Sequence, residues 1–413
     1  MEKPVTQAAI TVLKLKSQMD DPLRACVHCG LCLEDCPTYR LTGDEGNSPR
    51  GRLLLWRSME EGRVEPDEWT DFYTDECVGC LACETACPAN VPYGHLLEKA
   101  RHEQVAAGRA KIDWKIRAAG VAVKKPALFN LALSPARALR ALGALPHSLV
   151  FPGKPAVTES TASYARRLVE EKQPTGPSAA LLTGCLMEAL FREINFATVR
   201  VLVENNVRVV IPEDQGCCGA FHEHTGMSGL EEMIERNRRS FRDKKIDRVL
   251  SNSAGCGLAL GKALEGDPPV QDVLGFLGEV GVKSRRKRPE HEKVFIDLPC
   301  HLIHGQKVAG IPKNVLDATG YIWQLAPCAR DCCGSGGVYN IQKPQNARDI
   351  LRGKSAFFNE LPSECAPILA TANHVCMMQW NTARAFVKRP FQVRHVIQLL
   401  DPLNETHANT PSS

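Results

Sequence analysis

Six short hydrophobic runs, rich in valine, isoleucine and leucine, recur through the second half of the chain, and each is followed by a cysteine. They are predicted to be strands at residues 179–183, 207–211, 248–250, 293–297, 321–325 and 368–371. Between them lie segments whose apolar side chains recur at helical spacing, such as residues 230–242. Strands that alternate with helices are typical of a parallel sheet, so we expect an α/β fold with parallel sheets here.

The N-terminal part of the chain is predicted to be helical instead. Two helices are expected, over residues 49–61 and 91–104. The first has a clear start, because Ser48 can cap the first turn and Pro49 fits the first helical position. Arg50 and Arg52 follow directly, and we expect both to be exposed on that first turn.

Residues 114–155 differ in composition from the parts on either side. They are rich in alanine and leucine, carry dispersed lysines and arginines, and are interrupted by five prolines. Two short linking helices are the favoured prediction, because no helical face is clearly apolar. A basic amphipathic surface for a membrane or a partner protein is the alternative.

Two copies of the motif CxxCxxCxxxCP lie in the helical N-terminal part. Their cysteines are Cys26, Cys29, Cys32 and Cys36 in the first copy and Cys77, Cys80, Cys83 and Cys87 in the second. In the bacterial ferredoxin motif, three cysteines bind one 4Fe-4S cluster and the fourth binds the other cluster. The predicted ligand sets are Cys26, Cys29, Cys32 and Cys87 for one cluster and Cys77, Cys80, Cys83 and Cys36 for the other. Zinc sites usually present paired CxxC units, so the motif predicts electron transfer. Arg50 and Arg52 lie between the two copies, and the alternative to their exposure is that their charge raises the potential of a nearby cluster.

Eight further cysteines repeat in the second half of the chain. The first set is Cys185, Cys217, Cys218 and Cys256, and the second is Cys300, Cys332, Cys333 and Cys376. Cys300 follows Cys185 by 115 residues, and Cys332 follows Cys217 by the same number, which indicates an internal duplication. Ligands of open parallel sheets lie beyond the carboxyl ends of the strands, so the cysteines of each copy are expected to converge there.

Composition limits the classes of function. The 413 residues suggest two or three domains, and a net charge of +4 gives no case for nucleic-acid binding. The 18 cysteines are too sparse for a secreted disulfide scaffold, so reduced thiols and a cytoplasmic location are expected. We expect neither a signal peptide nor a membrane-spanning segment.

The motifs that are absent from the sequence also define the role. The sequence contains no dinucleotide-binding glycine motif after a strand, no P-loop, no catalytic serine elbow and no HExxH helix. A 4Fe-4S cluster carries single electrons and cannot by itself abstract a hydride from an alcohol. We therefore expect no catalytic residue in this chain and expect its electrons to enter from another polypeptide.

Several short motifs resemble those of a known family. They are SPRGR at residues 48–52, TGC at 183–185, GCCGA at 216–220, AGCG at 254–257, PCHLIHGQ at 299–306, CCGSGG at 332–337 and TANHVC at 371–376. Together with the cysteine ladders, they resemble the iron-sulfur subunit of bacterial glycolate oxidase over nearly the full chain. The paired CCG modules resemble those of heterodisulfide reductases.

The resemblance implies a division of the chain. We expect an α-helical ferredoxin domain with two 4Fe-4S clusters and then a duplicated α/β domain. The predicted boundaries are 1–112 for the ferredoxin domain, 113–177 for a helical linker, 178–282 and 293–401 for the two CCG modules, and 402–413 for a flexible tail.

The resemblance also implies a function. FAD-binding partner subunits would oxidise glycolate, with D-lactate as a second candidate substrate, and pass electrons singly through this chain. Quinone is the expected acceptor, and the chain would then lie at the inner face of the cytoplasmic membrane. The alternatives are the iron-sulfur subunit of anaerobic glycerol-3-phosphate dehydrogenase, a heterodisulfide-reductase-like protein and a non-catalytic assembly scaffold.

One departure from the CCG pattern leaves the metal content of these modules open. Modules of the heterodisulfide reductase type end in CxxC, but Ser253 and Asn373 replace the first cysteine of that pair. Four cysteines per module are enough for a further cubane cluster or a zinc site, and a structural role for the thiols is the alternative. His224 and His301 are candidate donors to a cluster sulfur.

Overall fold

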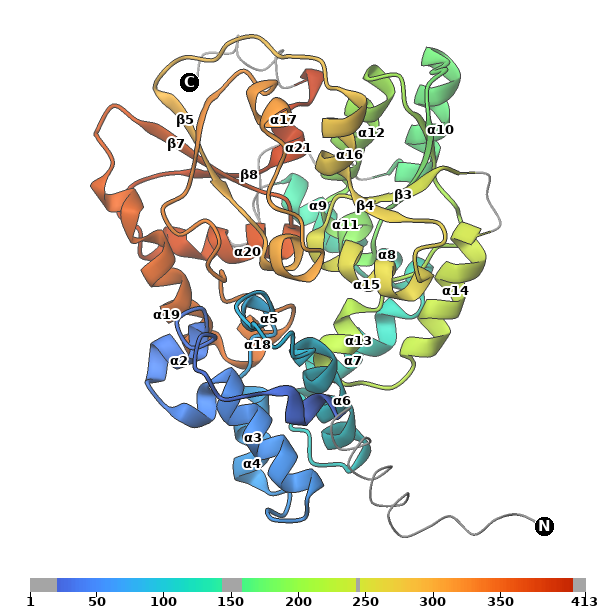
Figure 1. Cartoon of the computed structure of the whole chain (residues 1–413). Coiled ribbons are helices and arrows are strands. Elements are labelled where there is room, and N and C mark those ends of the chain that lie inside the picture. The colour runs from blue at the N-terminus through green and yellow to red at the C-terminus, as the bar shows by residue number, and fades with distance from the viewer. Residues whose placement is uncertain (1–20, 143–157, 243–245, 404–413) are drawn as a thin grey trace, which may run out of the picture. The chain divides into compact units, whose positions relative to one another are not determined.

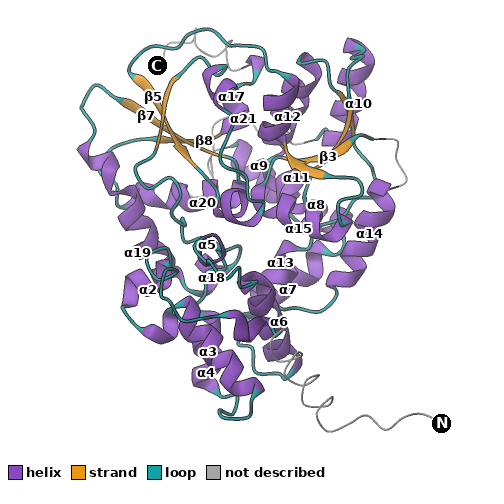
Figure 2. Cartoon of the chain, in the orientation of Figure 1, coloured by secondary structure: helices purple, strands orange, loops and turns teal. Residues whose placement is uncertain are grey.

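The computed structural model of the chain describes residues 21–142, 158–242 and 246–403 (Figure 1). The chain divides into two compact units. Unit 1 contains the residues up to Lys111 together with His224–Gly226, and unit 2 contains the remainder. Figure 2 shows that helices dominate and that the strands gather in two sheets.

Unit 1 is helical throughout its described residues. Its helices are η1 Pro22–Ala25, α2 Pro37–Thr42, η2 Glu45–Asn47, α3 Pro49–Glu60, α4 Glu68–Asp75, α5 Ala82–Thr85 and α6 Tyr93–Ala106. The predicted start of α3 is confirmed, because Ser48 Oγ accepts a hydrogen bond from the Gly51 N–H at 2.9 Å. Leu53 and Trp56 of α3 pack with Leu97 of α6 in the core of this unit.

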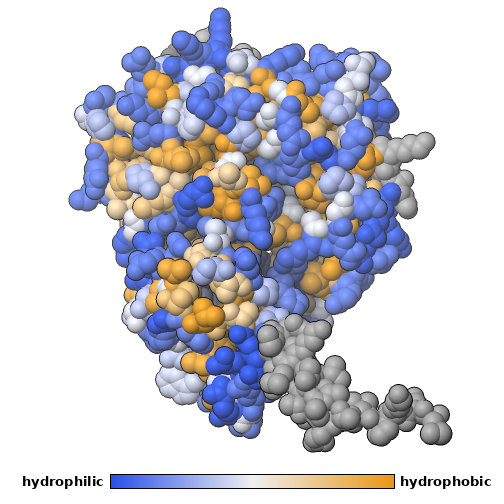
Figure 3. Space-filling view, viewed as in Figure 1, coloured by the Kyte–Doolittle hydropathy of each residue, from blue (hydrophilic) through white to orange (hydrophobic). Residues whose placement is uncertain are grey.

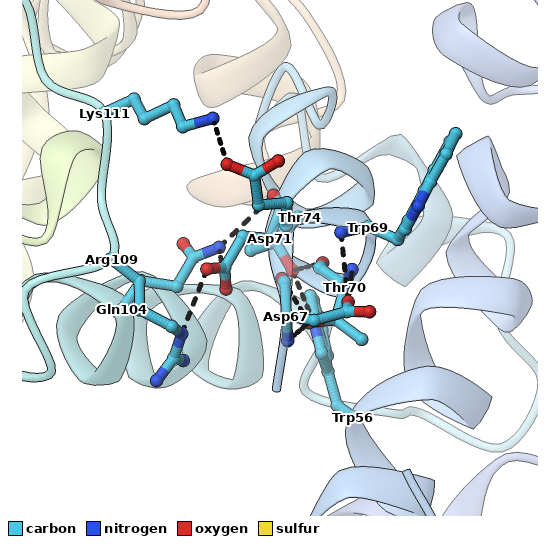
Figure 4. A network of polar contacts seen from close by, with 10 residues as sticks. Trp56, Asp67, Trp69, Thr70, Asp71, Thr74, Gln104, Arg109 and Lys111 are labelled. Carbon is cyan, nitrogen blue, oxygen red and sulfur yellow. Dashed lines mark hydrogen bonds and ion pairs between the residues drawn. The ribbon is translucent and has the colours of Figure 1, made fainter. Parts of the chain in front are cut away.

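A polar network fixes the chain on both sides of the second cysteine ladder (Figure 4). Asp67 and Thr70 form a reciprocal capping box at the start of α4, with N–H···O distances of 2.9 and 2.8 Å. Asp71 in α4 then accepts hydrogen bonds from Gln104 Nε2 and Arg109 Nε, both at 3.0 Å. Because α4 precedes the ladder and α6 follows it, these bonds hold the two ends of the ladder in place.

The linking segment contains three helices in its described residues, where two were predicted. They are α7 Trp114–Val123, α8 Pro126–Ala132 and α9 Ser134–Ala141. Proline occupies an early position of both α8 and α9, where its missing N–H is tolerated. Pro126 and Pro135 therefore start helices as well as ending the ones before them, and Pro146, Pro152 and Pro155 lie outside the described residues.

Unit 2 contains two four-stranded parallel sheets of the same strand order. The first comprises β1 Ser178–Leu182, β2 Arg208–Val210, β3 Arg248–Ser251 and β4 Val270–Asp272, in the order β2-β1-β3-β4. The second comprises β5 Glu292–Asp297, β6 Ile322–Leu325, β7 Ala366–Thr371 and β8 Gln392–His395, in the order β6-β5-β7-β8. All neighbouring strands in both sheets are parallel. The predicted α/β fold and its duplication are confirmed, but β4 and β8 were not predicted.

Helices separate the strands in both modules. In the first module they are α10 Thr161–Lys172, α11 Cys185–Leu190, α12 Arg192–Glu204, α13 Ala220–Thr225, α14 Leu230–Arg242, α15 Ala254–Leu264 and α16 Val273–Val280. In the second they are η4 His301–Gly305, α17 Lys313–Asp317, α18 Tyr339–Gln342, α19 Pro344–Ser355, η5 Ala356–Glu360, α20 His374–Thr382, η6 Ala383–Ala385 and α21 Val396–Leu399. One hydrophobic core contains residues of both sheets, so the two modules fold against each other.

Candidate metal centres

A cavity in unit 1 is surrounded by the first cysteine ladder and the end of the second. Its lining includes Cys26, Cys29, Cys32, Cys83 and Cys87. The loop between the first three cysteines turns sharply, because His28 and Gly30 adopt positive φ angles of 55° and 85°. Arg50 Nη1 donates a hydrogen bond to the His28 carbonyl at 3.2 Å, which supports this turn. The last cysteine of the second ladder therefore lies with the first three cysteines of the first ladder.

A second cavity has the complementary set. Its cysteines are Cys36, Cys77, Cys80 and Cys83. Cys36 ends the first ladder, so this cavity receives one cysteine from the first ladder, whereas the first cavity receives Cys83 and Cys87 from the second ladder. The thiol environment is polar on one side, where Tyr93 Oη donates a hydrogen bond to Cys77 Sγ at 3.4 Å. Cys83 lines both cavities, so the two cavities are neighbours within unit 1.

Arg52 also lines the second cavity, and its side chain is fully buried. Its Nε donates to the Tyr73 carbonyl at 2.6 Å, and its Nη2 donates to Thr38 Oγ1 at 3.2 Å. Nη1 is buried and has no hydrogen-bond partner among the described residues. The expectation of an exposed Arg52 was wrong, because the polar groups of unit 1 hold its guanidinium inside.

Burial and charge act in opposite directions on this site. Burial lowers the pKa of Arg52, but the nearby Tyr93 and Cys77 act the other way, so its pKa lies above the ordinary value. Burial raises the pKa of Cys32 to about 11 and also raises the pKa of Cys36 and Cys83. A buried cation with a spare N–H beside several thiols is a site that fits a negatively charged group.

In the first module of unit 2, the four predicted cysteines lie together. Cys185 begins α11 after β1, and Cys256 lies in the first turn of α15 after β3. Cys185 Sγ lies 3.5 Å from Cys217 Sγ. Hydrogen bonds from the thiols of Cys185 and Cys218 lower the pKa of Cys217, and the bond to Cys218 lowers the pKa of Cys256.

The second module repeats this arrangement of cysteines, and two of its sulfurs also accept hydrogen bonds from neighbouring N–H groups. Hydrogen bonds with Cys332 and Cys376 lower the pKa of Cys333. The Gly334 N–H donates to Cys332 Sγ at 3.3 Å, and Asn373 Nδ2 donates to Cys376 Sγ at 3.3 Å. Cys300 is half-buried at the end of the loop after β5. The hydrogen bond with Cys333 and burial raise the pKa of Cys376. In the described ranges, no three histidine, cysteine or acidic side chains are placed to hold a single metal ion.

The two positions that lack a CxxC cysteine lie against each other. Ser253 Oγ donates to Asn373 Oδ1 at 3.0 Å and lies 3.1 Å from His374 Nδ1. All three side chains are buried. The sequence shows each substitution but not that the two meet, because they are 120 residues apart.

A buried ion pair distinguishes the second module from the first. Lys354 Nζ in α19 lies 2.6 Å from Asp297 Oδ1 at the end of β5, and both side chains are at most 2% exposed. The charge of Lys354 contributes to the low pKa of Cys333. In the first module, Asn237 of α14 accepts from the Gly216 N–H at 2.9 Å and donates to the Cys217 carbonyl at 2.8 Å. Lys354 and Asp297 belong to none of the sequence motifs, so neither was predicted.

The two histidines that were predicted as donors to a cluster sulfur, His224 and His301, lie in different helices. His224 lies in α13, and His301 is buried in η4 directly after Cys300. Among the described residues, which include all 18 cysteines, no disulfide is formed. In the described residues, no helix has the length and apolar content that a membrane span requires.

Both the N-terminal part and the second half of the chain match models of known protein families. Residues 22–91 match the model of the 4Fe-4S dicluster domain, and residues 179–261 and 295–381 match the model of the cysteine-rich domain. The glycolate oxidase iron-sulfur subunit of Escherichia coli is 30% identical over 93% of this chain and 95% of its own length. The chain belongs to the glycolate oxidase iron-sulfur subunit family.

Two further relatives show the breadth of this similarity. The probable glycolate oxidase iron-sulfur subunit of Bacillus subtilis is 29% identical over 89% of this chain and 90% of its own length. One polypeptide of the dihydromethanophenazine:CoB–CoM heterodisulfide reductase of Methanosarcina barkeri is 25% identical over 92% of this chain and 93% of its own length. The predicted resemblance to glycolate oxidase iron-sulfur subunits is confirmed. As a member of this family, the chain is an iron-sulfur protein of oxidoreductase complexes.

Proposed function

We propose that the chain is the electron-transfer subunit of a flavin-dependent glycolate oxidase complex. The observation that carries the proposal is the pair of cavities in unit 1 that are lined by cysteines of both ladders. Cys87 lies with Cys26, Cys29 and Cys32 around one cavity, and Cys36 lies with Cys77, Cys80 and Cys83 around the other. This crossing is the arrangement expected of two adjacent 4Fe-4S clusters. The partner subunits would bind FAD and oxidise glycolate, because no flavin-binding motif is found in this sequence.

The proposed ligand sets follow the two cavities. They are Cys26, Cys29, Cys32 and Cys87 for one 4Fe-4S cluster and Cys77, Cys80, Cys83 and Cys36 for the other. Bound clusters of this kind would accept and release single electrons. The residues fit such a group, because Arg52 brings a buried positive charge and a spare N–H to the second cavity.

The chain's own residues set the environment of these electrons. Arg52 and the Tyr93 hydroxyl both favour negative charge on the sulfurs, which raises the reduction potential of the second site. Cys36, Cys77 and Cys80 are buried, so water has little access there. Cys29 is exposed, and the first site is therefore the one closer to solvent.

In unit 2 we propose that one or both CCG modules hold a further metal centre. Each module groups four thiols beyond the carboxyl ends of its strands, where ligands of parallel sheets bind. Four thiolates match a cubane cluster or a zinc ion, and the five thiolates of the heterodisulfide reductase module are not available. Ser253 and Asn373 occupy the positions of the two absent cysteines and form a hydrogen bond with each other.

The hydrogen bond between Ser253 and Asn373 also helps to distinguish the alternative functions. A heterodisulfide reductase requires the CCG site itself to be catalytic, and a polypeptide of such an enzyme is a relative of this chain. The hydrogen-bonded Ser253 and Asn373 argue against that chemistry here. Glycerol-3-phosphate oxidation by a partner protein would use the same electron route, so substrate tests must separate it from glycolate oxidation.

Electron delivery requires an acceptor, and we propose membrane quinone. Delivery to quinone would place the complex peripherally on the inner face of the cytoplasmic membrane. Glycolate, and D-lactate as a second substrate, would be oxidised in the cytoplasm.

Single cysteine variants in the complete complex test the proposal. Cys32→Ala and Cys83→Ala should leave the flavin reducible by glycolate and should abolish electron delivery to a quinone analogue. Cys328→Ala is the matched control, because Cys328 lies outside both ladders and both CCG sets. Full acceptor activity in the Cys32 and Cys83 variants would remove the two sites from the electron route.

A further inference from the structure

The helices α7, α8 and α9 of unit 2 expose an unusual number of large apolar side chains. Six of the 18 exposed large hydrophobic residues in the described chain lie within residues 114–142. They are Trp114, Val121, Leu128, Leu131, Leu139 and Leu142. On the face drawn in Figure 3, hydrophobic side chains appear in separate patches among hydrophilic ones, which is normal for protein surfaces. The six exposed apolar side chains within residues 114–142 differ from such scattered patches, because they lie on or directly after three consecutive helices.

These side chains follow helical spacing. Trp114 and Val121 are seven residues apart and share one face of α7, whereas Ile116 and Val123 are buried on another face. No residue of α8 is buried, and Leu128 and Leu131 are 57% and 68% exposed. Exposed large apolar side chains therefore occur on each of these three consecutive helices, and we call the surface that carries them the α7–α9 face.

The polar residues of α9 point the other way. Arg137 and Arg140 are buried, and Arg137 Nη1 donates to the Ala189 carbonyl at 2.8 Å. Arg140 donates to the Leu190 carbonyl and pairs with Glu193. A helix that faces water normally exposes its charges and buries its leucines, but α9 exposes Leu139 and buries two arginines. Its outer face is thus suited to an apolar environment.

Charge indicates what covers the α7–α9 face. The sequence from residue 114 to residue 158 contains no aspartate or glutamate. Lys115, Arg117 and Lys125 are exposed beside the apolar side chains, and Lys124 is half-buried. Exposed leucines beside lysines and an exposed tryptophan, with no acidic residue, are the features of a helix that lies in a membrane interface. Anionic lipid headgroups would complement the lysines and Arg117.

We infer that the α7–α9 face binds the surface of a bilayer containing anionic phospholipid. Its leucines and Trp114 would enter the boundary between headgroups and acyl chains, and its basic side chains would contact lipid phosphates. The inference deepens the proposed delivery of electrons to membrane quinone, and it rests on that proposal for its physiological purpose. Lipid binding itself is measured without any substrate or acceptor.

Co-sedimentation of the full-length, cluster-containing chain with vesicles tests the inference. Vesicles of phosphatidylcholine with one quarter phosphatidylglycerol should bind the chain, and pure phosphatidylcholine should bind it more weakly. The variant Leu128→Asp/Leu131→Asp should bind the anionic vesicles at least about tenfold more weakly. Ile341→Asp is the matched control, because Ile341 is 60% exposed on α18 outside this face, and it should bind like the unmodified chain.

Two further measurements separate the possible outcomes. Lys115→Glu/Lys125→Glu should remove the preference for anionic vesicles without loss of bound iron, which shows that the variant is folded. Electron transfer from glycolate to a water-soluble acceptor should be unchanged in all these variants, so its loss would concern the proposed function and not lipid binding. Absence of vesicle binding, equal binding by the Leu128→Asp/Leu131→Asp variant, or failure of that variant to bind the flavoprotein partner would each overturn the inference, the last by showing that a protein covers this face.

Discussion

A buried guanidinium beside cysteine thiols restricts what can bind between them. Arg52 is held by backbone and side-chain oxygens of unit 1, and its remaining N–H group faces no described acceptor. A site of this kind stabilises negative charge, since the cation is already desolvated by the fold. The potential of the second site should therefore depend on this single side chain.

Replacing Arg52 by glutamine should lower the reduction potential of the second cluster by roughly 60 mV or more, because about 59 mV is one tenfold change for a single electron. Removal of the cation destabilises the reduced, more negative form. Arg52→Lys should retain most of the potential, and Arg50→Gln, at a half-buried residue paired with Glu45, is the matched control. An EPR-monitored redox titration gives the values, and an unchanged potential in Arg52→Gln would contradict this role.

His395 should make stability depend on pH. Its Nδ1 accepts from the Ile397 N–H at 3.2 Å, and its Nε2 lies 2.8 Å from the Asn252 carbonyl, an arrangement that suits the neutral ring. Burial lowers its pKa to about 4. Between about pH 6.5 and 4 the unfolded chain binds a proton that the folded chain does not, so the contribution of His395 to the free energy of unfolding falls as pH falls.

The measurement compares urea unfolding of the unmodified chain and His395→Asn at about pH 7 and pH 5.5. The unmodified chain should lose about 1.3 kcal/mol more than the variant in total between these two pH values. Above about pH 6.5 the two should show the same pH dependence. Parallel behaviour throughout would mean that His395 is protonated in the folded chain.

At the scale of elements, the repeated sheets differ at the end of one strand. Leu182 ends β1 opposite Ser251, and Asp297 ends β5 opposite Thr371, so these positions correspond in register. The second sheet thus carries the buried Asp297, paired with Lys354 of α19, where the first sheet has Leu182. Burial costs both charges their hydration, so each depends on the other.

Lys354→Met should destabilise unit 2 by about 3–5 kcal/mol, because it leaves the Asp297 carboxylate buried without its partner. The double variant Asp297→Leu/Lys354→Met removes both buried charges and should recover most of this loss. Denaturant unfolding of the three chains measures the effect. If the double variant were as unstable as Lys354→Met, the loss would come from packing and not from an unpaired charge.

Several elements were predictable because their signals are local. Ser48 and Pro49 start α3 as predicted, and six strands are long or hydrophobic enough to be found. The missed strands β4 and β8 are only three and four residues long, include polar residues and follow prolines. Their pairing with β3 and β7 makes them strands, and that pairing is not visible in their own sequence.

In the whole molecule, the parts of the sites that local sequence specifies were predicted, and the parts that depend on contacts between distant segments were not. The cysteines of the two ladders were identified from the sequence, because they are only a few residues apart in a regular spacing. Arg52, the contact of Ser253 with Asn373 and the pair of Lys354 with Asp297 depend on residues brought together only by the tertiary fold. The duplication was visible from the cysteine offsets, whereas the difference between the two modules required the structure.

We propose that electrons from glycolate pass through the clusters of this chain. Anaerobic addition of glycolate to the native complex purified through this chain tests this route, with the EPR signal of reduced 4Fe-4S clusters as the readout. D-lactate and glycerol-3-phosphate are added to parallel samples. Glycolate should produce the signal and bleach the visible absorbance of the clusters. Reduction by glycerol-3-phosphate alone, or reduced flavin with fully oxidised clusters, would contradict the account.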